Sequence, residues 1–256
     1  MRRIVIWLWM PSIALFAVDG AEVFKNKCTS CHSHYYIPQS RLNVNYQNRN
    51  KDLNLTAPTL TELSFRLKDQ VGDRTTDAEG QKFEIEDYLT KFLKNPSAFK
   101  TILPKETRAA YGTMPPVNVD EDEVEALADF MYDYAEEMMV KHGAKRYSYK
   151  EALKKAKSEG KLVLIEGYLP YCRGCIWMDR NVMVEPKVKE ALDKDFVLVK
   201  MNLLIEKLPL GMKRLGTPSF YFIDPNGPKV IDMLEGTGTI EEFIQLLESI
   251  VQRVYR

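Results

Sequence analysis

The chain has 256 residues, a length that fits one or two domains with sizeable apolar cores. Apolar residues make up 45% of it and charged residues 28%, as in an ordinary globular protein. The 36 basic and 36 acidic residues cancel. Nothing in this charge balance favours nucleic acid or an anionic membrane surface as a partner.

The first 20 residues have the pattern of a secretory signal peptide. Arg2 and Arg3 precede an apolar stretch, Ile4 to Val18, and the best small-residue cleavage site is Val18-Asp19-Gly20. The stretch is about 15 residues long, short of the ~20 that a membrane span needs. An uncleaved N-terminal membrane anchor is the alternative. In either case we expect the rest of the chain to be exported.

The first of two cysteine pairs follows a short helix expected over residues 20–27. It reads Cys28-Thr29-Ser30-Cys31-His32, the attachment signal for a c-type haem. Cys28 and Cys31 would form the thioethers, and His32 would reach the iron from the same turn. A disulfide or another metal site is the alternative. Haem attachment suits the bacterial periplasm as the location.

A second haem ligand is expected further along the chain. Met114 is the candidate, in the loop Tyr111-Gly112-Thr113-Met114-Pro115-Pro116, where the prolines hold the backbone rigidly. His34 is too near His32 to cross to the other haem face, and His142 falls in a predicted linker. The methionines of the helix expected over residues 120–139 are assigned to packing: Met131, Met138 and Met139.

Together these motifs resemble a class I monohaem cytochrome c. The resemblance rests on Cys-Thr-Ser-Cys-His, on Gly112-Thr-Met-Pro-Pro and on a closing helix with Leu127-Ala-Asp-Phe-Met-Tyr-Asp. It implies an all-α domain over residues 21–140 with one covalent haem c. It also implies that the closing helix crosses the first one, which would bring Phe24 close to Phe130 or Tyr134.

Two more features follow from this resemblance. Ala57-Pro58 resembles the proline segment whose carbonyl oxygen receives the proton of the axial histidine, here His32. The spacing from His32 to Met114 is longer than small members of the family need. We assign the surplus to residues 34–56, predicted as an inserted loop, and expect a helix over 88–95 ended by Pro96.

After a linker at residues 141–147, the elements follow the order of an α/β thioredoxin fold over residues 148–256. The chain alternates helix and strand signals, with a second Cys-x-x-Cys between the first strand and a helix. The expected helices are 148–158, capped by Ser148 and ended by Gly160, then 176–181 and 240–254. The expected strands are 162–166, 196–201, 220–223 and 230–234.

The second cysteine pair, Cys172-Arg173-Gly174-Cys175, has the spacing of a redox dithiol. We expect Cys172 at a helix N-terminus, where the dipole and the charge of Arg173 favour its thiolate. Cys175 lies one turn later and would resolve a mixed disulfide. Pro218 is predicted to be cis and to face the dithiol. A structural disulfide or a copper site is the alternative.

Residues 146–256 resemble the C-terminal periplasmic domain of thiol:disulfide interchange proteins, and related periplasmic thioredoxins associated with sulfur oxidation. The resemblance lies in Tyr171-Cys-Arg-Gly-Cys-Ile-Trp-Met and in Asn181-Val-Met-Val-Glu-Pro-Lys-Val. It implies that Glu166 is buried behind the dithiol and shuttles protons to Cys175. A surface acid at the strand end is the alternative reading of Glu166.

The leading hypothesis is a periplasmic thiol–disulfide oxidoreductase with a covalent haem for electron transfer. Its partners would be protein or sulfur-carrier thiols and redox proteins. A dithiol releases two electrons and one haem accepts one, so direct exchange between the centres is a separate question. The alternative is an electron-carrier cytochrome c whose thioredoxin-like module docks a partner or handles copper.

Overall fold

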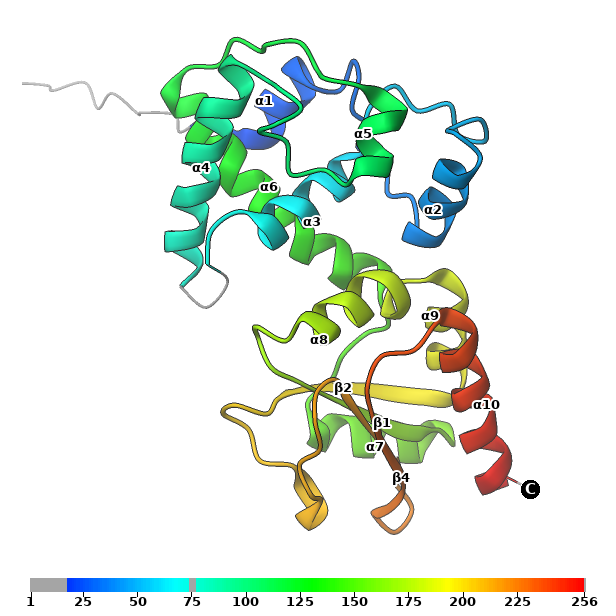
Figure 1. The fold of residues 1–256 in the computed structure, drawn as a ribbon. Helices are drawn as coiled ribbons and strands as arrows, with labels where there is room; N and C mark the ends of the chain where they lie inside the picture. The colour runs from blue at the N-terminus through cyan, green and yellow to red at the C-terminus, as the bar shows by residue number, and fades with distance from the viewer. Residues whose placement is uncertain (1–17, 74–76, 256) are drawn as a thin grey trace, which may run out of the picture.

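The computed structural model describes residues 18–73 and 77–255, which form two lobes (Figure 1). The upper lobe consists of helices, and the lower one combines a sheet with helices. Most of the predicted signal peptide, residues 1–17, lies outside the described residues. None of the helices within the described ranges is long and apolar enough to cross a membrane.

The upper lobe contains six helices in the described part of the chain, and local sequence explains where several of them begin. Asp19 caps the first helix, and reciprocal capping boxes start α3, at Thr59 and Glu62, and α6, at Asp120 and Glu123. The helices are α1 (Gly20–Lys27), α2 (Gln39–Gln47), α3 (Leu60–Gln70), α4 (Ala78–Lys94), α5 (Lys105–Tyr111) and α6 (Glu121–His142).

The core of this lobe forms where α6 packs on α1, α3 and α4. The Phe24 and Phe130 rings lie 6.0 Å apart, which confirms the expected contact between the first and last helices. The helices approach so closely that a Cβ atom at Gly20 would lie 1.9 Å from the Ala126 carbonyl oxygen. Gly20 therefore belongs to the fold, although the sequence pattern placed it in the signal peptide.

The prediction of a loop over residues 34–56 is wrong for its middle part, which is helix α2. Its side chains are mostly polar, so the helical period is hard to see, but Leu42 is 1% exposed and anchors it. The fully buried Asn45 then closes the following turn. Its side chain donates to Asn50 and accepts from the Leu53 amide. The surplus length is therefore an ordered part of the lobe.

The lower lobe is built on a four-stranded sheet with the order β2-β1-β3-β4. β1 pairs with β2 in parallel and with β3 antiparallel, and β3 pairs antiparallel with β4. The strands are β1 (Leu162–Tyr168), β2 (Phe196–Asn202), β3 (Ser219–Asp224) and β4 (Lys229–Glu235). The predicted sequence of strands is confirmed, with ends one or two residues longer.

Helices cover both faces of this sheet. On β1, Leu162 and Leu164 pack toward α9 and α10, while Val163 and Ile165 pack toward α7. Burial on both faces explains why β1 is a continuous apolar run. The helical elements are α7 (Tyr149–Glu159), α8 (Arg173–Met178), the π-helical turn η1 (Asp179–Met183), α9 (Pro186–Asp195), the short 3₁₀ turn η2 (Pro209–Gly211) and α10 (Ile240–Tyr255).

The two lobes are joined by polar and apolar contacts. The Arg180 guanidinium donates to the Phe65 carbonyl oxygen and pairs with Asp69. At the other side of the interface, the Ser40 hydroxyl donates to the Glu185 carboxylate at 2.8 Å. A small apolar cluster fills the space between the lobes, formed by Phe65, Ala135, Met139 and Val184.

Candidate functional site

The dithiol lies where β1 gives way to α8. Cys172 is the N-cap of α8, and its Sγ accepts the Cys175 backbone N–H at 3.1 Å. The two cysteines form a disulfide with Cα atoms 5.2 Å apart. Cys172 is half-buried, whereas Cys175 is 1% exposed. An incoming sulfur can therefore approach Cys172, and Cys175 is shielded behind it.

A cis-proline faces this motif. The Thr217–Pro218 peptide is cis, as predicted, and Pro218 directly precedes β3. A Cβ atom at Gly174 would lie 3.1 Å from Pro218 Cδ, so the first turn of α8 packs directly on the proline. The glycine between the two cysteines permits this close approach. The structure thus brings Pro218 and the dithiol together.

Glu166 lies on β1 and is fully buried. Its partner in the parallel register is Lys200 on β2, whose Nζ is 3.3 Å from the Glu166 carboxylate. Lys200 gives its hydrogen bonds to Asp179 instead, so neither Glu166 oxygen accepts one from the described residues. Arg146 completes the cluster, 2.8 Å from Asp179 and 3.9 Å from Glu166.

This environment raises the pKa of Glu166. Burial is the main cause, because it penalises the charged carboxylate, and the negative charge of Asp179 acts in the same direction. The positive charges of Lys200 and Arg146 oppose the shift. A buried carboxyl with a raised pKa, six residues before the first cysteine of the dithiol, is the kind of group that clusters at functional sites.

The first cysteine pair begins at a helix C-terminus, whereas the dithiol begins at a helix N-terminus. Cys28 is the C-cap of α1 and is half-buried against the core of the upper lobe, whereas Cys31 is exposed. Burial raises the pKa of the Cys28 thiol to about 11, with a smaller opposing effect from Lys27. Met114 lies in an extended loop, as expected, and packs against the same apolar core as Cys28.

The His32 ring is held in one orientation. It is 9% exposed, and its Nδ1 donates to the Pro58 carbonyl oxygen at 2.7 Å, the contact expected for this segment. Burial lowers the pKa of His32 and favours the neutral ring. With Nδ1 acting as the donor, the Nε2 lone pair is left for another ligand. Within the described ranges, no group of three or more His, Cys, Asp and Glu side chains is arranged for a metal ion.

The charged partners of Glu166 were not among the residues predicted for the site. Asp179 lies four residues after Cys175, which places both on one helical face, and this spacing was an available signal. Lys200 and Arg146 come from a strand and from the segment between the lobes, so only the tertiary fold brings them to Glu166. His34 and His142 instead pack on tyrosine rings, those of Tyr35 and Tyr36.

Comparison with known proteins supports this description of the lower lobe. Residues 144–225 match the model of a thioredoxin-like family. Over 88 residues, or 34% of this chain, the sequence is 32% identical to a protein disulfide-isomerase of Hordeum vulgare. The matched region spans only 17% of that protein's length.

Similar solved structures include a thioredoxin from Thermus thermophilus, 26% identical with a TM-score of 0.38, covering 43% of this chain and 88% of that one. Another is the reduced C-terminal domain of DsbD from Neisseria meningitidis, 22% identical with a TM-score of 0.32, covering 39% of this chain and 91% of that one. The family match, the sheet order and the dithiol beside a cis-proline agree. The C-terminal part of this chain is a thioredoxin-like domain.

Proposed function

We propose that the chain is a thiol–disulfide oxidoreductase that acts through Cys172 and Cys175 on the thiols or disulfides of proteins or sulfur carriers. The observation that carries the proposal is the position of Cys172. It caps α8, is partly open to solvent, and lies in a motif that packs on cis-Pro218. Helix N-termini stabilise thiolates, which are the attacking form. The similarity to a protein disulfide-isomerase is consistent with this chemistry.

In the reducing direction, the Cys172 thiolate attacks one sulfur of a substrate disulfide. The substrate S–S bond breaks, a mixed disulfide forms, and the first substrate thiolate takes up a proton. Cys175 then loses its proton and attacks Cys172 Sγ, which releases the second substrate thiol. Two electrons pass to the substrate, and the chain retains the Cys172–Cys175 disulfide. The oxidising direction is the reverse.

Cys175 must lose its proton while it is shielded from solvent. We assign this proton to the Glu166 carboxylate, because Glu166 is buried on the neighbouring strand and its pKa is raised. Asp179 and Lys200 set the charge around it. Glu166 is therefore a proton-carrying residue in this proposal, and Asp179 and Lys200 are positioning residues.

We further propose that the upper lobe carries one covalent haem c. Cys28 and Cys31 would hold it by thioethers, and His32 and Met114 would supply the iron ligands. Two observations fit such a group: Cys28 and Met114 adjoin the same apolar core, and His32 has an available Nε2. When bound, the haem supplies a one-electron centre. The chain's own contribution is to orient His32 through Pro58 and to exclude water with the apolar core.

We place this activity in the bacterial periplasm. The proposal rests on the secretory pattern of residues 1–20 and on the disulfide, since disulfides persist in oxidising compartments. Fractionation of the producing cells would test it, with the chain expected in the periplasmic or membrane-bound fraction. Recovery of the chain in the cytosolic fraction alone would contradict it.

A matched pair of variants tests the two centres separately. Cys172→Ser is expected to abolish reduction of a fluorogenic peptide disulfide and to keep the covalent haem, measured by its absorption spectrum in alkaline pyridine. Cys28→Ser is expected to do the reverse. Exchange that survives in Cys172→Ser would contradict the oxidoreductase proposal. A wild-type chain with a haem but without exchange would favour the electron carrier instead.

A further inference from the structure

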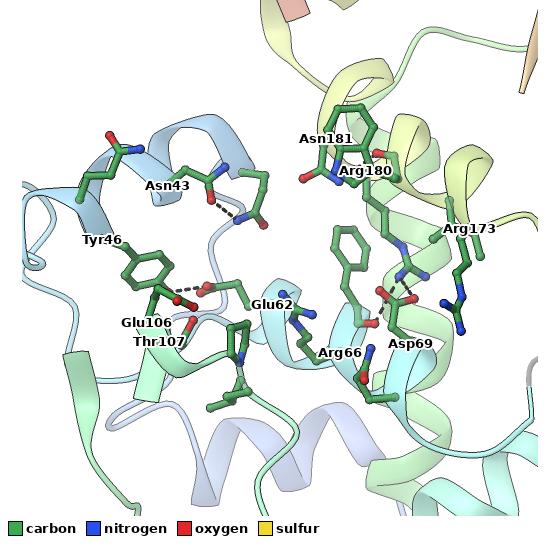
Figure 2. Close-up of a pocket in the computed structure, with 18 residues that line it drawn as sticks. Asn43, Tyr46, Glu62, Arg66, Asp69, Glu106, Thr107, Arg173, Arg180 and Asn181 are labelled. Atoms are coloured by element: carbon green, nitrogen blue, oxygen red, sulfur yellow. Dashed lines mark hydrogen bonds and ion pairs between the residues drawn. The ribbon is translucent and has the colours of Figure 1, made fainter. Parts of the chain in front are cut away.

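A cleft of about 850 Å³ lies between the two lobes (Figure 2). One wall comes from α2, α3 and α5 of the upper lobe, and the other from α8 and η1 of the thioredoxin-like domain. This volume lies within the range of sites that bind small molecules or short segments of a partner. The cleft has no assigned role in the exchange reaction described above.

The cleft adjoins the reactive cysteine. Arg173, Ile176 and Trp177 of α8 line it, and Trp177 is 43% exposed. Arg173 directly follows Cys172, the partly exposed N-cap of α8, whereas Cys175 is 1% exposed. A molecule that fills the cleft therefore contacts the residue next to Cys172.

The charges of the cleft are unevenly distributed. Figure 2 shows Glu62 and Glu106 toward one end and Arg173 toward the other, with Arg66 between them. Glu62 is engaged, because it accepts the hydroxyl of Tyr46 and belongs to the capping box of α3. The end near the dithiol is therefore the basic end of the cleft.

Two guanidinium groups that line the cleft are available to a ligand. Arg180 is paired with Asp69, but Arg66 and Arg173 form no ion pair or side-chain hydrogen bond with any described residue. Guanidinium groups bind carboxylates with two parallel hydrogen bonds. The remaining polar lining consists of amide side chains, which match the hydrogen-bonding groups of a polypeptide backbone: Gln39, Asn43, Gln47, Gln70 and Asn181.

We propose that this cleft binds the polypeptide segment next to the substrate's exchanging cysteine, and that Arg66 and Arg173 recognise an acidic side chain on that segment. The inference rests on the proposed exchange at Cys172 and specifies its substrate class. It also gives the upper lobe a direct part in substrate selection, because Arg66 belongs to α3. Neither arginine takes part in bond breaking, so Arg66 is a specificity-determining residue.

The test compares two peptide disulfides with blocked ends, which differ only in Asp or Asn two residues from the cysteine. The holoprotein is first reduced with dithiothreitol and freed of it, and the rate of peptide reduction is then followed. Each reduced molecule reduces one peptide, so the measured quantity is the second-order rate constant of a single turnover. We expect this rate constant to be about five- to tenfold higher for the Asp peptide, mainly through tighter binding, as one charge-assisted contact would give. A small dicarboxylate disulfide, 3,3′-dithiodipropionate, shows whether a carboxylate without a peptide suffices.

Variants assign this preference to the cleft. Arg66→Gln is expected to remove it by lowering the rate for the Asp peptide alone, Arg66→Lys to retain part of it, and Arg173→Gln to weaken it. Arg41→Gln is the control, since Arg41 is exposed on α2 and does not line the cleft. A structural defect would slow both peptides equally, and circular dichroism would reveal unfolding.

Four outcomes are decisive. Equal rates for both peptides in the wild-type chain would overturn the inference and leave the oxidoreductase proposal standing. A preference that survives in Arg66→Gln would also overturn it. If neither peptide is reduced, the proposed exchange activity itself fails. A rate for 3,3′-dithiodipropionate as high as that of the Asp peptide would overturn the assignment to polypeptide substrates.

Discussion

The two Cys-x-x-Cys motifs of this chain lie at opposite ends of their helices. Cys28 ends α1, and its backbone N–H donates to the Phe24 carbonyl oxygen. Cys172 begins α8, and its sulfur accepts the backbone N–H of Cys175. A helix presents free carbonyl groups at its C-terminus and free amides at its N-terminus. The two motifs have the same spacing, but their first thiols have different surroundings. Cys28 lies among hydrogen-bond acceptors, and Cys172 lies among hydrogen-bond donors.

This difference separates two kinds of cysteine chemistry. A thiolate is disfavoured at Cys28, where burial raises the pKa to about 11, and the thiol is better suited to a permanent covalent bond than to exchange. At Cys172, amide donors favour the thiolate, and the sulfur stays accessible to a partner. Helix polarity and burial therefore distinguish the two motifs. In the sequence alone, only His32 distinguishes them.

The largest predicted effect is on thiol reactivity in the chain produced without haem and reduced. With a pKa of about 11, Cys28 has a thiolate fraction near 10⁻⁴ at pH 7, so we expect alkylation ~300-fold slower than for an ordinary cysteine. Cys172 should react faster than an ordinary cysteine. Iodoacetamide labelling followed by mass spectrometry measures both sites in one sample. Similar rates at Cys28 and Cys172 would remove the basis of the comparison.

The next largest effect concerns the contact that holds the two lobes together. Arg180→Ala leaves the Asp69 carboxylate and the Phe65 carbonyl oxygen without this donor. We expect a loss of about 2–4 kcal/mol in the free energy of unfolding and separate melting of the lobes, measured by calorimetry. Lys189→Ala is the control: its i,i+4 pair with Asp193 is exposed and is worth at most ~0.5 kcal/mol. An unchanged single transition would mean that the Arg180 contact does not hold the lobes together.

A third prediction concerns how the stability of the lower lobe depends on pH. Burial raises the pKa of Glu166 to about 7 in the folded state, so the folded state retains a proton that the unfolded chain loses. The resulting stability is full below the unfolded pKa and is lost as pH rises through the folded pKa. This loss is on the order of 1–3 kcal/mol in the free energy of unfolding, and we expect Glu166→Gln to remove it. Urea unfolding at several pH values would measure it.

The matched control for this experiment is Glu190→Gln, at an exposed position of α9. Its stability profile should follow that of the wild-type chain over the same pH range. In Glu166→Gln, Lys200 keeps its pair with Asp179, so no new unpaired lysine complicates the comparison. A pH profile unchanged by Glu166→Gln would mean that the buried carboxyl does not titrate in this range.

The smallest effect is expected at the N-terminus of α1, the end opposite Cys28. The Asp19 side chain accepts the Ala21 backbone N–H at 2.9 Å, and Asp19→Ala should cost about 1 kcal/mol. Asp19→Asn should cost less, because asparagine is also a good N-cap. Neither change should alter the labelling rate of Cys28, at the far end of the helix. Thermal denaturation and the labelling assay would check both expectations.

The helices and strands that neighbouring residues determine could be predicted from the sequence. Ser148 and Gly160 bound α7 as expected, because the capping box and the left-handed glycine are properties of neighbouring residues. The strands of the sheet were visible as apolar runs. Whether the upper lobe is a cytochrome c domain stays a prediction, and its haem is a proposal.

Where distant segments decide the structure, the sequence was less informative. Leu42 looked like an isolated apolar residue in a polar stretch, yet it anchors α2. The sequence left Glu166 open as a surface acid or a buried one, and the burial of β1 on both faces of the sheet decided this. The position of Arg180 between the lobes leaves no local signal in the sequence, because its partners lie more than 100 positions earlier in the chain.

The π-helical turn η1 has a mechanical consequence. Its first residue, Asp179, pairs with Lys200 near the buried Glu166, and the next, Arg180, reaches across to Asp69. Consecutive side chains of one short turn therefore hold the charged cluster around Glu166 and the boundary between the lobes. A displacement of one lobe against the other would move the same backbone that positions Asp179. If the proposed function holds, substrate binding in the cleft and the acidity of Glu166 would depend on one turn of the chain.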